Sequence, residues 1–433
     1  MERNLFKRKV TENQSSSSSP SSPPTMSPPS RPTSFIPKHT SSSFSDNRIS
    51  SSIQQQNDEA FKPEVDYASH GLEQHDVAVE GRGVFRMYTM NHLHHQNTNN
   101  EQSNTNTTTT TSLPAHLIKT RKCESVLVFI HGAGLSSLSW TLCMQNLRQL
   151  VIRSGNTNNV NINFMRSPPT PIEMGMGQPK SASEAFNVDD YEYCAMDLRG
   201  HGASHTEKDS ELSIDTLVDD IIALLQQVYR GKKRNFILIG HSLGGSIAVR
   251  CAHKMDIIEE QETKSGTVQS HELMTVKGVV VIDMVEGSAL TSLPNTKKFI
   301  ESRPNKFKNM ESAIKWSIQH GVVNNISSAV ISIPSQLMHV EEGNYYTWRT
   351  NLTDSEEYWT AWFTDMSQIF LEVKGLKLLM ITSTDILDKE LTIAQMQGKF
   401  QMKVLNRSGH CIQEDDPAHC SEVIFSFLHR FRL

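Results

Sequence analysis

The stretch FILIGHSLGGS, residues 236–246, decides the fold class of this chain. Four apolar residues run into a G-x-S-x-G pattern centred on Ser242, and a helical pattern leaves it. A strand, a tight turn and a helix in this order form a nucleophile elbow, whose flanking small residues avoid a steric clash. The helix N-terminus favours a developing anion beside the serine. We therefore expect Ser242 to be a catalytic nucleophile; a glycine-rich turn with an idle serine is the alternative.

Short apolar runs alternate with helical patterns on both sides of this motif. Buried strands are predicted at 126–130, 193–196, 236–239, 279–282, 378–381 and 402–405, with a strand pair at 77–88 and helices at 215–229 and after Pro417. Such alternation predicts an α/β protein with a mostly parallel central sheet and helices on both faces. Together with the elbow it predicts an α/β-hydrolase fold. Residues 289–370 show helix-like patterns only, so we expect a helical cap insertion over the strand ends.

A second glycine turn, His131-Gly-Ala-Gly134, follows the predicted strand 126–130. An oxyanion hole needs two backbone N–H groups that converge on one oxygen atom. We expect Ala133 in this turn and Leu243 in the elbow to supply them. A third glycine turn at 197–202 also ends a strand, and we expect it to be structural.

The general base should be a histidine late in the chain, because the order in this fold is serine, acid, histidine. His410 directly follows a predicted strand and precedes the last helix, which makes it the candidate. The acid has two candidates, Asp283 and Asp385, each at the end of a predicted strand. The pattern slightly favours Asp385, because the acid usually follows the penultimate strand of this fold. Spacing does not decide between them.

Composition divides the chain into a segment predicted to be disordered and a segment predicted to be folded. Residues 1–65 are rich in Ser, Pro and Asn, with too little apolar surface to offset the entropy of ordering, and are predicted to be disordered. Residues 66–433 are predicted to form the hydrolase domain. Two low-complexity stretches near 96–113 and 154–184 are predicted to be insertions in its surface loops.

Charge and cysteine usage exclude several classes of protein. The 433 residues include 42 Lys and Arg and 47 Asp and Glu, a net charge of −5, which argues against nucleic-acid and anionic-membrane partners. No stretch reaches the ~18–20 consecutive apolar residues of a spanning helix, and the N-terminus lacks an apolar signal segment. We expect neither a membrane protein nor a secreted one. The six cysteines are scattered, with no CxxC pair and no His/Cys cluster at zinc spacing, so we expect free thiols and no metal. We expect a cytoplasmic location, with a nuclear share left open.

Several strings beyond these motifs resemble the protein phosphatase methylesterase family. The resemblance covers roughly Val77 to the C-terminus, apart from the two insertions, and rests on VVVIDMVEGSAL (279–290), SRPNKFKNMESAIKWSIQHG (302–321), YTWRTNL (346–352), LTIAQMQGKFQM (391–402) and SGHCIQEDDP (408–417). This family removes the methyl ester from the C-terminal leucine of the protein phosphatase 2A catalytic subunit. The resemblance implies that subunit as partner, Ser242 as nucleophile, His410 as base and Asp283 as acid. It therefore reverses the preference for Asp385.

The resemblance implies a serine hydrolase that works through an acyl-enzyme and needs no cofactor. Aromatic residues of the cap are candidates for contact with the substrate or partner, although packing within the cap is the simpler interpretation of each: Trp316, Tyr346, Trp348, Trp359 and Trp362. Two alternatives stay open. One is a generic small-molecule carboxylesterase with the same triad, and the other is a phosphatase-binding regulatory protein that acts without turnover.

Overall fold

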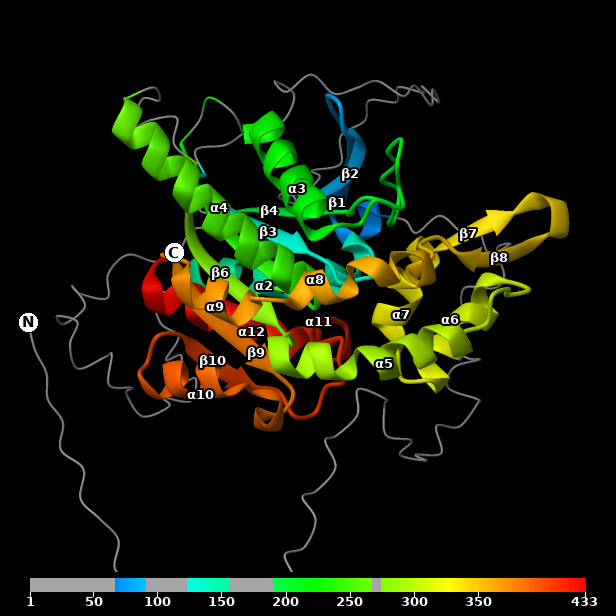
Figure 1. Ribbon diagram of the computed structural model, residues 1–433. Coiled ribbons are helices and arrows are strands. Elements are labelled where there is room, and N and C mark those ends of the chain that lie inside the picture. The colour runs from blue at the N-terminus through cyan, green and yellow to red at the C-terminus, as the bar shows by residue number, and fades with distance from the viewer. Residues whose placement is uncertain (1–66, 91–122, 156–190, 230, 232, 267–273) are drawn as a thin grey trace, which may run out of the picture. The chain divides into compact units, whose positions relative to one another are not determined.

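In the computed structural model of the chain, the described residues are 67–90, 123–155, 191–229, 231, 233–266 and 274–433 (Figure 1). They all belong to the second of two compact units, Phe35–Leu433. The predicted disordered segment 1–65 lies outside the described residues, as do the predicted insertions 96–113 and 154–184, except that helix α2 includes residues 154 and 155.

An eight-stranded sheet forms the centre of the fold, in the order β1-β2-β4-β3-β5-β6-β9-β10. Its strands are β1 (Leu72–Val79), β2 (Gly83–Met90), β3 (Ser125–Ile130), β4 (Tyr191–Met196), β5 (Arg234–His241), β6 (Met274–Ile282), β9 (Leu376–Ile381) and β10 (Gln401–Val404). The pairs β1–β2 and β2–β4 are antiparallel, and the five other pairs are parallel. The predicted mostly parallel sheet is confirmed.

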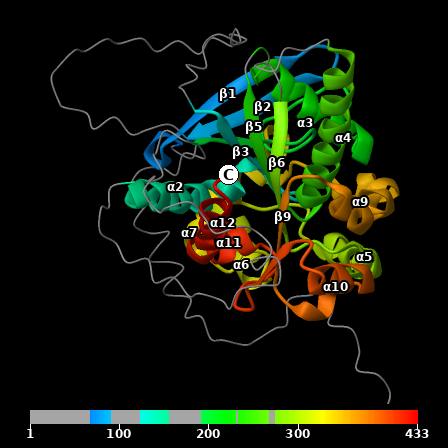
Figure 2. The same ribbon diagram turned by 90° about the vertical axis from the view of Figure 1, so that its left-hand side faces the viewer.

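Helices cover both faces of this sheet (Figure 2). One face carries α2 (Thr141–Gly155), α11 (Ile412–Asp415) and α12 (Pro417–Phe431), and the other carries α3 (Ile214–Tyr229), α4 (Leu243–Ser265), α9 (Met366–Glu372) and α10 (Lys389–Met396). Strand β3 shows how the sheet joins the two layers. Its Val128 belongs to the apolar cluster of α3 and α4, whereas Leu127 and Phe129 belong to that of α2 and α12, because successive side chains point to opposite faces. No helix in the described part of the chain is both long and apolar enough to cross a membrane.

Between β6 and β9 the chain leaves the sheet and forms an inserted segment, residues 286–363. It contains α5 (Glu286–Ser302), α6 (Met310–Gln319), α7 (Ile326–Ser332), α8 (Trp359–Phe363) and the hairpin β7 (Leu337–Val340)–β8 (Tyr345–Trp348). The hairpin differs from the expectation of helices only. Each of its strands has four residues, too few for the alternation that identifies a strand in a sequence.

Candidate active site

Ser242 lies in the turn between β5 and α4. Its φ of 53° and ψ of −123° are strained for a residue other than glycine. Its N–H donates to the carbonyl oxygen of Ile282 (3.0 Å), which ties the turn to β6. A Cβ atom on Gly240 would lie 2.1 Å from the carbonyl oxygen of Gly244, and one on Gly244 would lie 2.2 Å from that of Ile130. The two outer glycines of the motif are therefore required because backbone passes against them.

The turn after β3 packs against this elbow. A Cβ atom on Gly132 would lie 3.1 Å from the Cβ atom of Ser242. The N–H of Gly134 donates to His201 Nε2 (3.0 Å), and the N–H of Leu135 donates to the carbonyl oxygen of Gly132 (3.1 Å). Both of these N–H groups are consequently used inside the protein.

Ala133 and Leu243, the two expected oxyanion donors, both lie near Ser242. Ala133 lines the same cavity as Ser242. Of its two neighbours, Gly132 accepts a hydrogen bond at its carbonyl oxygen and Gly134 donates one from its N–H. Leu243 is the first residue of α4, and the first N–H groups of a helix have no intrahelical acceptor. The assignment of Ala133 and Leu243 as the oxyanion donors stays a prediction.

His410 and Asp283 are paired. His410 Nδ1 carries the proton and donates to Asp283 Oδ2 at 2.9 Å, since a carboxylate oxygen can only accept. Asp283 is 2% exposed, and its Oδ1 accepts from both the N–H and the hydroxyl of Thr382, each at 3.0 Å. Because Nδ1 is engaged by the carboxylate, proton transfer at His410 uses Nε2.

The other candidate acid does not reach this histidine. Asp283 directly follows β6 with a φ of 48°, and its N–H donates to the carbonyl oxygen of Met380 (2.7 Å) in the neighbouring strand β9. Asp385 lies in a short 3-10 helix (Thr384–Ile386) and is exposed. The structure pairs His410 with the acid that the family resemblance implied, and not with the one that the pattern alone favoured.

His241, which precedes the nucleophile, connects the elbow to the loop of His410. Its Nε2–H donates to the carbonyl oxygen of His410 (2.9 Å), and the two ring centroids are 4.7 Å apart. Burial, reinforced by the nearby His410, lowers the pKa of His241 well below 6.5. His241 is therefore neutral at neutral pH, and sequence reasoning did not single it out.

Two more buried histidines hold the glycine turn in place. His131 Nε2 accepts from the N–H of Leu198 (3.0 Å), and His201 Nε2 accepts from the N–H of Gly134. Burial lowers the pKa of His131 to about 4 and that of His201 to about 3. Both rings therefore stay neutral and can accept these hydrogen bonds at neutral pH.

The third glycine turn has the expected structural role. Asp197 accepts from the N–H (2.8 Å) and hydroxyl (2.6 Å) of Ser137 and from the N–H of Ala203 (2.8 Å). Arg199 donates to the carbonyl oxygen of Lys208 (3.4 Å) in the loop and also forms a bidentate pair with Asp220, at 2.8 Å for both bonds. The carboxylate comes from α3, and no pattern in the sequence indicates that tertiary contact.

Removal of the Asp220 carboxylate should destabilise the fold. Asp220 also accepts from Arg82 (3.0 Å), and Arg199 is only 7% exposed, so Asp220→Ala would leave a buried cation without its partner. We expect the free energy of unfolding to fall by ~3–5 kcal/mol, measured by urea denaturation. The neighbouring, partly exposed Asp219 contacts Arg82 and Lys254 at the surface, and Asp219→Ala should cost less than about 1 kcal/mol. Equal losses in the two variants would contradict this interpretation.

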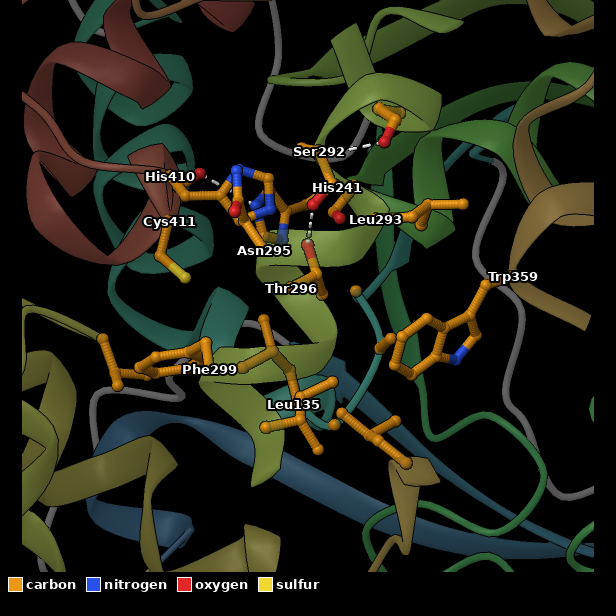
Figure 3. A pocket seen from close by; sticks show the side chains of 18 of the residues that line it. Leu135, His241, Ser292, Leu293, Asn295, Thr296, Phe299, Trp359, His410 and Cys411 are labelled. Atoms are coloured by element: carbon orange, nitrogen blue, oxygen red, sulfur yellow. Dashed lines mark hydrogen bonds between the residues drawn. The ribbon is translucent and has the colours of Figure 1, made fainter. Parts of the chain in front are cut away.

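Ser242 and His410 line a cavity of about 230 Å³ that the inserted segment covers (Figure 3). His241 and His410 lie on one side of it, and Phe299 of α5 and Trp359 of α8 lie on others. Its lining is mostly apolar, as expected for a site that binds a small apolar group.

The five predicted cap aromatics divide between the cavity and the hairpin. The tryptophans Trp316, Trp348, Trp359 and Trp362 line the cavity. Tyr346 does not: its backbone pairs with Phe307, and its ring packs on His339 (4.9 Å) in the hairpin.

Sequence reasoning predicted a helical cap but did not single out the residues of α5 that line the cavity. Ala289, Leu293, Thr296 and Ile300 line the cavity at spacings of three and four residues, which place them on one face of the helix. That periodicity is visible in the sequence and could have identified which face of the predicted helix lies over the site. Met284, beside the acid, and Arg303, beyond the end of α5, were also missed.

Cys411 lines the cavity directly after His410 but is not a candidate nucleophile. Burial, together with the nearby Glu414 and Asp415, raises the pKa of the Cys411 thiol well above its usual value. The group is therefore a thiol at neutral pH and not the reactive thiolate. The described residues contain no cluster of three His, Cys, Asp or Glu side chains that could hold a metal ion.

Glu414 gives the fold a measurable pH dependence. It is fully buried, and burial raises its pKa from 4.5 to about 8. Between these two values the folded state holds one proton more than the unfolded state, so the contribution of Glu414 to stability falls as pH rises, by at most ~1.4 kcal/mol per pH unit. Glu414→Gln should therefore gain stability relative to wild type from about pH 5 to 8 in urea titrations. A constant difference, like that expected for the exposed Glu390→Gln, would contradict this.

Comparison with known proteins agrees with this geometry. A model of the alpha/beta hydrolase family matches residues 127–419. A probable protein phosphatase methylesterase 1 from Caenorhabditis elegans is 37% identical over 239 residues, 55% of this chain and 61% of its own length. Protein phosphatase methylesterase 1 from Schizosaccharomyces pombe is 39% identical over 241 residues, 55% of this chain and 65% of its own length. The human protein of the same name is 33% identical over 279 residues, 55% of this chain and 68% of its own length.

The chain thus spans less than two thirds of the worm and yeast relatives and slightly more than two thirds of the human one. Among solved structures, an E-2-(acetamidomethylene)succinate hydrolase is similar with a TM-score of 0.52 and 16% identity, over 83% of this chain and 99% of that one, which shows the shared fold. The chain belongs to the alpha/beta hydrolase family and, within it, to the protein phosphatase methylesterases.

Proposed function

We propose that this chain is a serine hydrolase that removes the methyl ester from the C-terminal leucine of the protein phosphatase 2A catalytic subunit. The observation that carries the proposal is the hydrogen bond between His410 and Asp283 (2.9 Å), beside an elbow serine that lines a mostly apolar cavity. The names of the relatives support a phosphatase as substrate.

In the first half of the reaction, Ser242 attacks the ester carbonyl carbon while His410 Nε2 takes the serine proton. Asp283 holds the proton on Nδ1 and stabilises the imidazolium that forms. The N–H groups of Ala133 and Leu243 bind the oxyanion, where loss of one donor costs ~3–4 kcal/mol in comparable sites. His410 then protonates the leaving oxygen, methanol departs, and an acyl-enzyme remains on Ser242.

In the second half, His410 deprotonates a water molecule that attacks the acyl carbon. Collapse of the tetrahedral intermediate returns the proton to Ser242 and releases a free C-terminal carboxylate. Every proton transfer uses a residue of this chain, so the reaction needs no cofactor.

The cavity lining fits a leucine side chain next to the ester. Apolar side chains from α5 and α8, such as Leu293 and Trp359, face the same space as Ser242. A methyl group alone offers little surface to bind, so selectivity must come from this pocket and from the phosphatase surface around it.

A comparison of substrates tests the proposal against its two alternatives. The full chain is incubated with a peptide that ends in leucine methyl ester and with a short aryl ester, and the acid products are quantified. A methylesterase should hydrolyse the peptide ester, and a glycine in place of the leucine should lower kcat/KM. Turnover of the aryl ester alone would favour the generic carboxylesterase. Phosphatase binding without turnover of any ester would favour the regulatory protein.

A further inference from the structure

Arg303 is held in a defined position at the edge of the inserted segment. It directly follows α5, and its N–H donates to the carbonyl oxygen of Ile300 (3.2 Å). The guanidinium carbon lies 4.4 Å from the centre of the Trp348 ring, a cation–π contact. Trp348 is itself fixed, because its Nε1–H donates to the carbonyl oxygen of Pro304 (2.9 Å) and its ring packs edge-on against Phe307 (5.4 Å).

No acidic group in the described part of the chain neutralises this arginine. Its Nε atom is buried without an acceptor, and no described carboxylate forms an ion pair with it. Burial alone lowers the pKa of Arg303 to about 10, so the guanidinium is still charged at neutral pH. Arg303 as a whole is half-buried, and the cation–π contact with Trp348 contributes only about 0.5–2 kcal/mol. Its guanidinium therefore has no carboxylate partner in the described part of the chain.

This charge lies at the wall of the substrate cavity. Arg303 lines the same cavity as Ser242 and His410, and the described residues that line it include no aspartate, glutamate or lysine. Gln336, a 4% exposed lining residue, also has a buried side-chain nitrogen without an acceptor. It precedes Leu337, which pairs with Trp348 across the hairpin, so this second donor belongs to the same end of the cavity. Two buried donor atoms at this end of the cavity, Arg303 Nε and Gln336 Nε2, thus have no acceptor in the described part of the chain.

We propose that Arg303 is an anion-binding subsite of this cavity, which binds a carboxylate that the substrate polypeptide carries shortly before its esterified C-terminal residue. The inference rests on the proposed function, because it concerns the peptide that precedes the ester. A guanidinium presents two parallel N–H donors that match the two oxygens of a carboxylate. A side-chain carboxylate is present before and after hydrolysis, so Arg303 would bind substrate without holding the product more tightly.

Matched peptides test this subsite. Peptides that end in leucine methyl ester are prepared in pairs that differ only in Glu or Gln at one of the three preceding positions. For wild type, the best Glu peptide should have a kcat/KM roughly 10- to 100-fold above that of its Gln partner, the range for a hydrogen bond to a charged group. The difference should lie in KM, because ground state and transition state make the same contact.

Three variants separate a binding role from a structural one. Arg303→Gln should lower kcat/KM for the Glu peptide to the level of the Gln peptide, and should change the Gln peptide less than about threefold. Arg303→Lys should keep part of the preference, because the charge stays but the paired donors are lost. The matched control is Lys306→Gln, which removes an exposed cation that packs on Tyr345 outside the cavity, and it should keep the full preference.

Several outcomes would overturn the subsite. They are equal rates for Glu and Gln at all three positions in wild type, a preference that survives Arg303→Gln, and an equal loss for both peptides in that variant. A fourth test asks whether Arg303 binds the carboxylate of the product instead. The Gln peptide with a free C-terminal acid should inhibit wild type and Arg303→Gln equally. Tenfold weaker inhibition of the variant would assign the arginine to the product carboxylate instead.

Failure of the proposed function would be distinguishable from failure of the subsite. If wild type hydrolyses no peptide ester, the methylesterase proposal fails. Calorimetric titration of the Glu peptide and of the Gln peptide into Ser242→Ala then still tests whether Arg303 binds the carboxylate. Tighter binding of the Glu peptide, lost when Arg303→Gln is added, would support the subsite; equal affinities or no binding would overturn it.

Discussion

Ser242→Ala should lower kcat for hydrolysis of a leucine methyl ester by about 10⁴- to 10⁶-fold. The variant loses the nucleophile and therefore the acyl-enzyme, while the donors at Ala133 and Leu243 remain. The residual rate reflects substrate binding and oxyanion stabilisation alone. Single-turnover assays with excess enzyme would measure it.

The matched control is Ser426→Ala, because Ser426 is an exposed serine of α12 that bonds only the helix carbonyl of Glu422 (2.8 Å). Its rate should equal that of wild type. A Ser242→Ala enzyme that keeps its structure and more than a tenth of wild-type activity would rule out Ser242 as the nucleophile.

Asp283→Asn should lower kcat by roughly 10⁴-fold, because an amide no longer holds the proton on His410 Nδ1 or stabilises the imidazolium. The effect should not arise from unfolding, since the carbonyl oxygen of the introduced amide can still accept hydrogen bonds from Thr382. Michaelis–Menten kinetics across neutral pH, with a thermal melting curve for each variant, would measure both effects.

Asp385→Asn is the matched control for the acid. Asp385 is exposed in its 3-10 helix, so its replacement should change kcat less than about threefold. Full activity of Asp283→Asn together with inactivity of Asp385→Asn would reverse the assignment of the acid.

The choice between these two aspartates shows where prediction from sequence stops. Both follow strands, β6 and β9, which are neighbours in the sheet, so local pattern places both carboxylates near the same edge. What separates them is tertiary: the left-handed backbone of Asp283, its bond to the carbonyl oxygen of Met380 and the two donors of Thr382 turn its carboxylate toward His410. None of these contacts leaves a periodic pattern or a fixed spacing in the sequence. Only the family resemblance indicated Asp283.

The elbow, by contrast, was predictable because its chemistry is local. Gly240 and Gly244 are required by contacts within a few residues of Ser242 and at the end of β3, and the apolar strand before them is continuous in the sequence. The periodic strands and helices of the sheet were predictable for the same reason.

The inserted segment was predictable only in part. The hairpin β7–β8 is too short to show its period, and Arg303 lies in the polar stretch SRPNK, which is typical of an exposed loop. Its position depends on a contact with the ring of Trp348, which is far away in the sequence. The position of a charged side chain at a cavity wall is a property of the packed structure.

The most direct test of the central claim is the loss of the methyl group from carboxymethylated protein phosphatase 2A catalytic subunit incubated with the full chain. We expect demethylation by wild type and Asp385→Asn, and none above background by Ser242→Ala or Asp283→Asn. A wild-type chain that binds the phosphatase but leaves its methyl ester intact would contradict the account.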